Sequence, residues 1–155
     1  MSDETGSWER TLSELDALTE ELEAEGWEVC SFPAGATGFE TRVEGENEDF
    51  GAIFVVPGDV AEELRELHER GEFPRYRVYG RTVSGRRFLV LRFDDPEAET
   101  CVLVAASFAV EDARRLLPDV RETGVVYVRF RTLDGTRVAT FELSDPGPLV
   151  PDAAE

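Results

Sequence analysis

Lysine is absent from this 155-residue sequence, and histidine occurs only once. All 16 basic residues are arginine. The missing lysine excludes Schiff-base chemistry and the lysine-containing phosphate-binding loop of many nucleotide hydrolases. A single histidine cannot build a histidine-based metal cluster. His68 follows Leu64 and Leu67 on an expected helix, which indicates a side chain at the edge of the core rather than a catalytic base.

Cysteine and long apolar runs are also scarce. The two cysteines, Cys30 and Cys101, each lie in an apolar, strand-like run, which predicts buried free thiols and a reducing compartment. No run of about eighteen apolar residues exists, so we expect no membrane span. The acidic start, Met1 to Glu4, is unlike a secretory signal. These features together predict a cytoplasmic location.

Acidic residues dominate the charge. The chain has 34 acidic residues and a net charge of −18. Such a charge repels itself in dilute buffer but is screened in molar salt, where the Debye length falls to about 3 Å. With its missing lysine, the composition resembles that of proteins from salt-in halophiles, and the chain resembles the uncharacterised conserved haloarchaeal proteins. This resemblance concerns the solvent and implies no activity, so we do not interpret the acidic surface as a docking site.

The length and the 41% hydrophobic content are those of one domain. Leucine at helical spacing predicts an amphipathic helix over residues 7–25, which ends at Gly26. Strands are expected over 27–32 and 38–43, followed by an acidic loop over 44–49. The predicted domain covers residues 1–143, and the proline-rich residues 147–155 are expected to form a flexible tail.

The chain repeats itself from residue 51 onward. An offset of 50 residues aligns 51–96 with 101–146 without a gap, and eleven aligned positions are identical. In the first copy these positions are Val60, Arg65, Leu67, Glu72, Val78, Arg81, Thr82, Gly85, Arg87, Asp95 and Pro96. Each copy is predicted to contain a strand, a helix, and a hairpin around a turn pair, Ser84-Gly85 or Asp134-Gly135.

The turns set the register of the hairpins and therefore the face of each side chain. The residues predicted to face the core are Tyr76, Val78, Leu89, Leu91 and Phe93 in the first hairpin, and Val126, Val128, Phe130, Ala139, Phe141 and Leu143 in the second. The residues predicted to face outward are Arg77, Tyr79, Arg81, Phe88, Val90 and Arg92 in the first, and Tyr127, Arg129, Arg131, Val138, Thr140 and Glu142 in the second.

In topology, these tandem β-α-β-β units resemble the paired modules of the gyrase-inhibitor-like superfamily of small-molecule-binding proteins. The resemblance implies an α+β fold with a largely antiparallel sheet and helices packed on one side. It also implies a cleft between the modules for an apolar or cationic ligand. The helix and strands over 7–43 are not part of that plan, and no ligand-binding motif matches residue by residue.

Arginine is concentrated between residues 70 and 92, where seven arginines accompany one acid, Glu72. The planar guanidinium suits oxyanions and aromatic stacking, to which tyrosine would add. The candidate anion-binding face comprises Arg77, Tyr79, Arg81, Arg92, Tyr127, Arg129 and Arg131. The alternative is a solvated face whose arginines pair with nearby acids. We favour this alternative, because phosphate binding weakens steeply with salt.

The sequence identifies no catalytic residue, metal ligand or cofactor, and we expect no enzymatic activity. The leading hypothesis is a non-catalytic binding or regulatory domain for a small molecule or a protein partner. A nucleotide or nucleic-acid binder that uses the Arg/Tyr face is a second, less favoured hypothesis. The third is a protein-interaction module or homodimer that buries an exposed face containing Phe88 and Val90. Whether the N-terminal helix covers that face decides among them.

Overall fold

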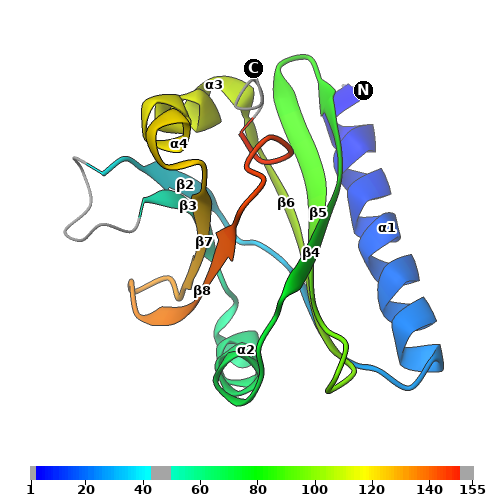
Figure 1. The fold of residues 1–155 in the computed structure, drawn as a ribbon. Coiled ribbons are helices and arrows are strands. Elements are labelled where there is room, and N and C mark those ends of the chain that lie inside the picture. Colours follow the sequence, from blue (N-terminus) through cyan, green and yellow to red (C-terminus); the bar gives the residue numbers. More distant parts are fainter. Residues whose placement is uncertain (1–2, 43–49, 151–155) are drawn as a thin grey trace.

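The computed structural model describes residues 3–42 and 50–150, with side chains from residue 5 onward (Figure 1). The predicted α+β class is confirmed. In chain order the elements are α1 (Asp3–Ala24), β1 (Glu28–Pro33), β2 (Thr37–Glu40), β3 (Gly51–Val55), α2 (Gly58–Arg70), β4 (Arg75–Val83), β5 (Arg86–Asp95), β6 (Thr100–Ala109), α3 (Val110–Ala113), the 3-10 helix η1 (Arg114–Leu116), α4 (Leu117–Thr123), β7 (Val126–Arg131) and β8 (Arg137–Leu143). The expected acidic loop over 44–49 lies outside the described residues.

The strands form two four-stranded sheets, and the expectation of one largely antiparallel sheet with helices on one side is wrong. The first sheet has the order β1-β6-β5-β4 and the second β2-β3-β7-β8. Each sheet is mixed, with one parallel pair, β1–β6 or β3–β7. Figure 1 shows the two sheets facing each other, with α1 on the far side of the first sheet. The hairpin β4–β5 belongs to the first sheet and the hairpin β7–β8 to the second, and their apolar faces pack against each other across the core.

The two strand–helix–strand–strand units exchange strands between the sheets. Strand β6 of the second unit pairs with β5 of the first in antiparallel fashion, whereas β3 of the first unit pairs with β7 of the second in parallel. The helices also differ, because α2 is continuous and its counterpart is broken into α3, η1 and α4 around Pro118. The element order of the two units agrees with the prediction, but their strand pairings are not equivalent.

The main core lies between the sheets. Phe130 of the second sheet packs edge-on against Phe32 and Phe93 of the first, with ring centroids 5.8 and 6.5 Å away. Phe93 also stacks on Phe141, with ring centroids 4.2 Å apart. All eleven residues predicted to face the core lie in or against this core. The inward faces of both hairpins were therefore predicted correctly from the turns. The outward assignment of Val138 is wrong, because a register shift between Phe130 and Arg131 leaves Val138 out of the ladder and it is buried in this core.

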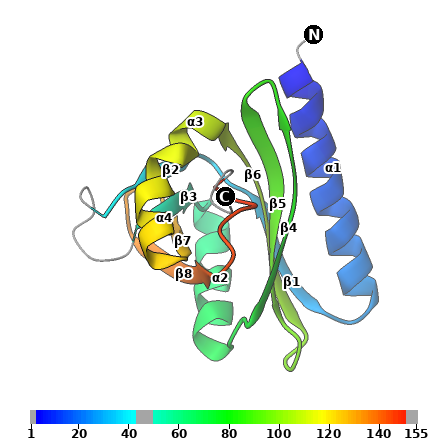
Figure 2. The ribbon, with the colours of Figure 1, turned by 45° about the horizontal axis from the view of Figure 1, so that its top comes forward.

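A second core lies between α1 and the outer face of the first sheet (Figure 2). Leu15 and Leu22 of α1 pack there with Val90, Leu103 and Cys101. The expected exposed face of the first hairpin is therefore wrong at its apolar positions, since Phe88 is 2% exposed and Val90 is 0% exposed. Strand β5 is central and apolar on both sides, so both of its faces require a cover.

Both cysteines are free and buried, as predicted, and they belong to different cores. Burial is the main cause that raises the pKa of the Cys30 thiol to about 12. Burial likewise raises the pKa of Cys101, with a smaller contribution from the neighbouring Asp94. Both thiols therefore stay protonated near neutral pH, and a protonated, buried thiol is a poor nucleophile.

The prediction of a flexible tail over 147–155 is wrong for residues 147–150. Leu149 and Val150 are fully buried in the main core. The backbone N–H groups of both residues donate to the Pro146 carbonyl, and the Arg87 Nε atom donates to the Pro148 carbonyl at 3.0 Å. Prolines in this segment shape a turn that returns the chain to the core. Residues 151–155 lie outside the described part of the chain.

Replacing the buried Leu15 tests the role of α1 as a cover. We expect Leu15→Ala to lower the free energy of unfolding by about 2–5 kcal/mol, because it leaves a cavity between α1 and the sheet. Leu133→Ala is the matched control, since Leu133 is 88% exposed and its truncation should cost less than about 0.5 kcal/mol. Urea unfolding at a fixed salt concentration measures both changes. Equal effects of the two substitutions would contradict a packed α1.

Candidate anion-binding site

The seven residues of the predicted anion-binding face do not share one surface. Arg77, Tyr79, Arg81 and Arg92 lie on β4 and β5 of the first sheet, whereas Tyr127, Arg129 and Arg131 lie on β7 of the second. The two sheets turn their predicted outer faces away from each other, because the inward faces form the core between them. The two groups are therefore separate and have to be considered individually.

The group on the second sheet is occupied by contacts within the protein. Glu40 of β2 accepts from Arg129 Nη1 and from Arg131 Nη1, both at 3.2 Å. Arg129 is buried, with 5% of its surface exposed. The Tyr127 hydroxyl contacts Glu142 at 3.2 Å. This cluster ties β2 to β7 across β3, and we assign it a structural role.

Most arginines between residues 70 and 92 also have acceptors within the protein. Arg81 Nη2 donates to the Ser7 carbonyl of α1 at 3.0 Å and pairs with Glu14 at 3.6 Å. Arg70 pairs with Glu28, and Arg86 donates to Ser107. The favoured alternative, in which the arginines between residues 70 and 92 pair with groups of the protein itself, thus holds for most of them.

Arg75 and Arg77 are the exceptions. Both are exposed on β4, and neither has a hydrogen bond or an ion pair with any described residue. Arg77 lies directly opposite Arg92 in the β4–β5 ladder, and Arg75 lies opposite Asp94. Like charges placed opposite each other across a ladder destabilise it. Asp94 is the single carboxylate among the residues that line this region with Arg75, Arg77 and Arg92.

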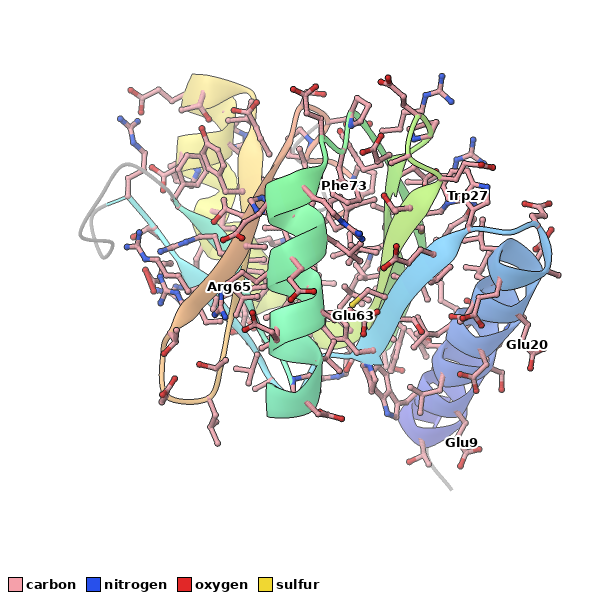
Figure 3. The ribbon with its side chains drawn as sticks, turned by 90° about the horizontal axis from the view of Figure 1, so that it is seen from below. Glu9, Glu20, Trp27, Glu63, Arg65 and Phe73 are labelled. Atoms are coloured by element: carbon pink, nitrogen blue, oxygen red, sulfur yellow. The ribbon has the colours of Figure 1, made fainter. Side chains whose placement is uncertain are left out.

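These residues line a cleft of about 440 Å³, which we call the basic cleft. Trp27, which Figure 3 labels at the turn between α1 and β1, is one of the lining residues. The full lining is Trp27, Pro74, Arg75, Tyr76, Arg77, Arg92, Asp94 and Pro96. Three arginines and one aspartate give the basic cleft a charge of +2 in a chain of net charge −18.

Arg92 is the fixed member of the basic cleft. Its Nε atom contacts both oxygens of Asp94 at 2.9 and 3.1 Å, and its Nη1 atom donates to the Tyr79 hydroxyl at 3.3 Å. Burial alone would lower the pKa of Arg92, but the hydrogen bonds with Asp94 and Tyr79 outweigh it and raise that pKa. Both carboxylate oxygens of Asp94 thus accept from Arg92. The guanidiniums of Arg75 and Arg77 are left available for a ligand.

Two further hollows lie elsewhere on the surface. The α1–β4 groove, of about 530 Å³, is lined by Arg10, Glu14, Ala17, Leu18, Glu21, Tyr79, Gly80 and Arg81. The inter-unit cleft, of about 700 Å³, lies between the start of α2 and the β7–β8 turn. Its lining includes Val55, Pro57 and Ala61 from the first unit and the exposed Leu133 from the second.

A family model described as a family of unknown function (DUF7529) matches residues 1–151. The chain belongs to this family. No curated protein matches the sequence. The matched residues include α1, both sheets and the basic cleft. We therefore expect other members of the family to share this fold.

Other chemistry is sparse across the described residues. No group of three histidine, cysteine, aspartate or glutamate residues among them is arranged to hold a metal ion. No described helix is long and apolar enough to cross a membrane. The His68 Nε2 atom lies 3.0 Å from the Thr140 carbonyl, and its ring packs edge-on against Phe141. This is the edge-of-core position that the helical spacing predicted.

The predicted face included Arg77 and Arg92 but not Arg75, Trp27 or Asp94. Trp27 precedes β1 by one residue and is about fifty positions from Arg75, so no local pattern connects the two. The pairing of Arg92 with Asp94 on the same face of β5 was readable from the period of two, since the residues are two positions apart.

Removal of the Glu40 carboxylate tests the structural role of the arginines on β7. We expect Glu40→Gln to lower the free energy of unfolding by about 2 kcal/mol, because the buried Arg129 and its neighbour Arg131 both lose the charged carboxylate of Glu40. Glu28→Gln is the control, since its pair with Arg70 is half-exposed and contributes less than about 1 kcal/mol. Urea unfolding compares the variants. A Glu40→Gln protein as stable as the control would show that this cluster does not hold β2 in place.

Proposed function

We propose that the protein is a non-catalytic binding domain that recognises an anionic group in the basic cleft. The observation that supports it is the pair Arg75 and Arg77, which have no acceptor among the described residues although the chain carries 34 acids. A carboxylate or phosphate between these guanidiniums would accept directed hydrogen bonds from both. It would also relieve the repulsion between Arg77 and Arg92 across the ladder.

The walls of the basic cleft favour an anion that carries an apolar or planar part. The Trp27 ring offers a flat surface beside the guanidiniums, and Tyr76 and Pro96 line the same hollow. Stacking on an aromatic ring contributes about 1–3 kcal/mol per base in nucleic-acid complexes. A nucleotide-like molecule satisfies both requirements, with its phosphate at Arg75 and Arg77 and its ring at Trp27.

A non-catalytic role agrees with the state of the nucleophiles and bases. Both thiols are buried in separate cores, and His68 packs at the core edge. The one carboxylate in the basic cleft, Asp94, is bound by Arg92. None of these groups is placed to act as a base on a ligand held by Arg75 and Arg77.

The proposal includes the setting in which the protein works. A charge of −18 without lysine supports a halophilic cytoplasm as that setting. The matching element order of residues 51–96 and 101–146 supports descent from one duplicated unit. The inter-unit cleft is lined by residues of both units, and the resemblance to gyrase-inhibitor-like proteins implies a ligand between the units, so it is a second candidate for an apolar compound. Its apolar lining and the exposed Leu133 favour that second role.

Salt titration tests the halophilic setting. We expect the melting temperature to rise steadily between 0.1 and 1 M KCl, because the Debye length falls from about 10 to about 3 Å and screens the acidic surface. The thermal midpoint measured by circular dichroism follows this change, and an equal osmolality of sucrose is the control for solvent exclusion. A midpoint that is unchanged or lower in 1 M KCl would contradict the setting.

Ligand binding tests the anion-binding role. We expect adenosine monophosphate, used as a probe in molar KCl, to raise the melting temperature, whereas adenosine does not. A ligand at about 100 times its Kd adds about 2.7 kcal/mol to stability. The double variant Arg75→Gln/Arg77→Gln should bind the probe at least tenfold more weakly, because it lacks both unpaired guanidiniums.

The control for this experiment is Arg121→Gln, whose side chain is exposed on α4 and outside the basic cleft. Equal loss in the control and in the double variant would indicate a general charge effect. If neither this probe nor inorganic phosphate binds, the proposed anion site is wrong. A shift with apolar compounds that is unaffected by the arginine variants would instead support the inter-unit cleft.

A further inference from the structure

We infer that the β4 edge of the first sheet binds an extended acidic peptide segment, which pairs with β4 as an added strand. One carboxylate of that segment would occupy the basic cleft, so the inference rests on the proposed anion-binding function. Three features of the first sheet support this inference: the free edge of β4, the order of hollows along it, and the charges around them.

Within residues 3–42 and 50–150, no strand pairs with the outer edge of β4, whereas the other sheet edges are covered. On β8, Arg65 and His68 of α2 contact the carbonyls of Arg137 and Thr140 at 3.4 and 3.0 Å. Strand β1 is flanked by α1 and α2, and Figure 3 shows α2 between β8 and β1.

Strand β2 is only four residues long, and Arg115 donates to its Phe39 carbonyl at 3.4 Å. Strand β4 has nine residues and, among the described strands, pairs with β5 alone. No described side chain forms a hydrogen bond with its backbone. An uncovered edge of this length is a template for an additional strand.

The hairpin turn determines which backbone groups face that edge. Ser84 and Gly85 both have positive φ, +50° and +79°, as in a two-residue primed turn. In such a hairpin the closing pair, here Val83 and Arg86, is hydrogen-bonded, and the bonded pairs then alternate along the strand. The backbone N–H and C=O groups of residues 76, 78, 80 and 82 are therefore directed to the free edge.

Two hollows follow one another along the same strand. The odd-numbered residues of β4 project to the side of α1, where Arg75 and Arg77 line the basic cleft and Tyr79 and Arg81 line the α1–β4 groove. Side chains of an added strand on that side recur every two residues, or about 7 Å. An acidic residue at the basic cleft would thus be followed, two or four positions away, by an apolar residue at the α1–β4 groove.

The charges around the edge favour an acidic peptide over the alternatives. In the α1–β4 groove Glu14 pairs with both Arg10 and Arg81, and Glu21 is a further acid, so this lining offers no net positive charge to a continuous phosphate backbone, which disfavours a nucleic-acid strand. A second copy of the chain pairing through β4 would bring Arg75, Arg77 and Arg81 against their counterparts. A peptide with a single well-placed carboxylate avoids both disadvantages.

The experiment uses four capped nonapeptides of alternating Thr and Val, each carrying Glu and Leu on one face. The four peptides combine the two orders of Glu and Leu with spacings of two and four positions. The two orders correspond to an added strand that runs parallel or antiparallel to β4. We expect at least one peptide to bind the full chain in molar KCl, measured by fluorescence anisotropy. Its Glu→Gln version should bind at least tenfold more weakly, because it cannot pair with Arg75 and Arg77.

N-methylation distinguishes strand addition from simple charge attraction. Methyl groups on one set of alternate amides should abolish binding, while methyl groups on the other set should leave it unchanged, since only one set faces β4. Equal binding by the two methylated versions overturns the inference. So does an absence of binding by all four peptides, or tighter, arginine-dependent binding of a short oligouridine.

A variant of β4 separates this inference from the proposed function. Thr82 is exposed and its N–H faces the free edge, a position that tolerates proline. Thr82→Pro should weaken peptide binding at least tenfold and leave adenosine monophosphate binding unchanged, with Thr82→Ser as the control. If the nucleotide binds and no peptide does, the inference is wrong and the proposed function stands. If sedimentation shows a dimer that Thr82→Pro dissolves, the occupant of the edge is a second copy.

Discussion

The two central strands of the first sheet, β5 and β6, are apolar on both faces, and the rest of the structure depends on covering both. Leu91 and Val104 face the second sheet, whereas Val90 and Leu103 face α1. At about 25 cal/mol per Å² of buried apolar surface, exposing either face would cost a large part of the stability of a domain of this size. The second sheet and α1 are therefore both necessary to the fold.

This constraint determines where a ligand can meet the protein. The middle of the outer face is closed by α1, so it cannot be an open platform. What stays accessible on that side is the area beyond the end of α1, where Trp27 and Arg75 lie, and the free edge of β4. The basic cleft and the α1–β4 groove both occur at the margins of the α1 contact. Their proximity is a consequence of how far one helix extends over one sheet.

The arginines show how context separates a structural from a binding role. Arg129 and Arg77 both lie on strands at positions facing away from the main core. Glu40 reaches Arg129 across β3, whereas Arg77 faces another arginine and has no acceptor among the described residues. Arginine stems can cover apolar surface in either case. The difference lies in whether an acid from a distant strand reaches the guanidinium, which residue type and strand position do not reveal.

The sequence by itself determined the elements and their faces. The period of two, counted from Ser84-Gly85 and Asp134-Gly135, was sufficient to assign Leu91 and Phe141 to the core, because alternation is a local property of a strand. The helical leucine spacing likewise indicated α1. Only the tertiary structure decided that the strands divide into two sheets, that α1 covers Val90, and that Leu149 returns to the core. It also brought Trp27 to Arg75. A local pattern shows that a face is apolar, but the partner that covers it is a long-range choice made by packing.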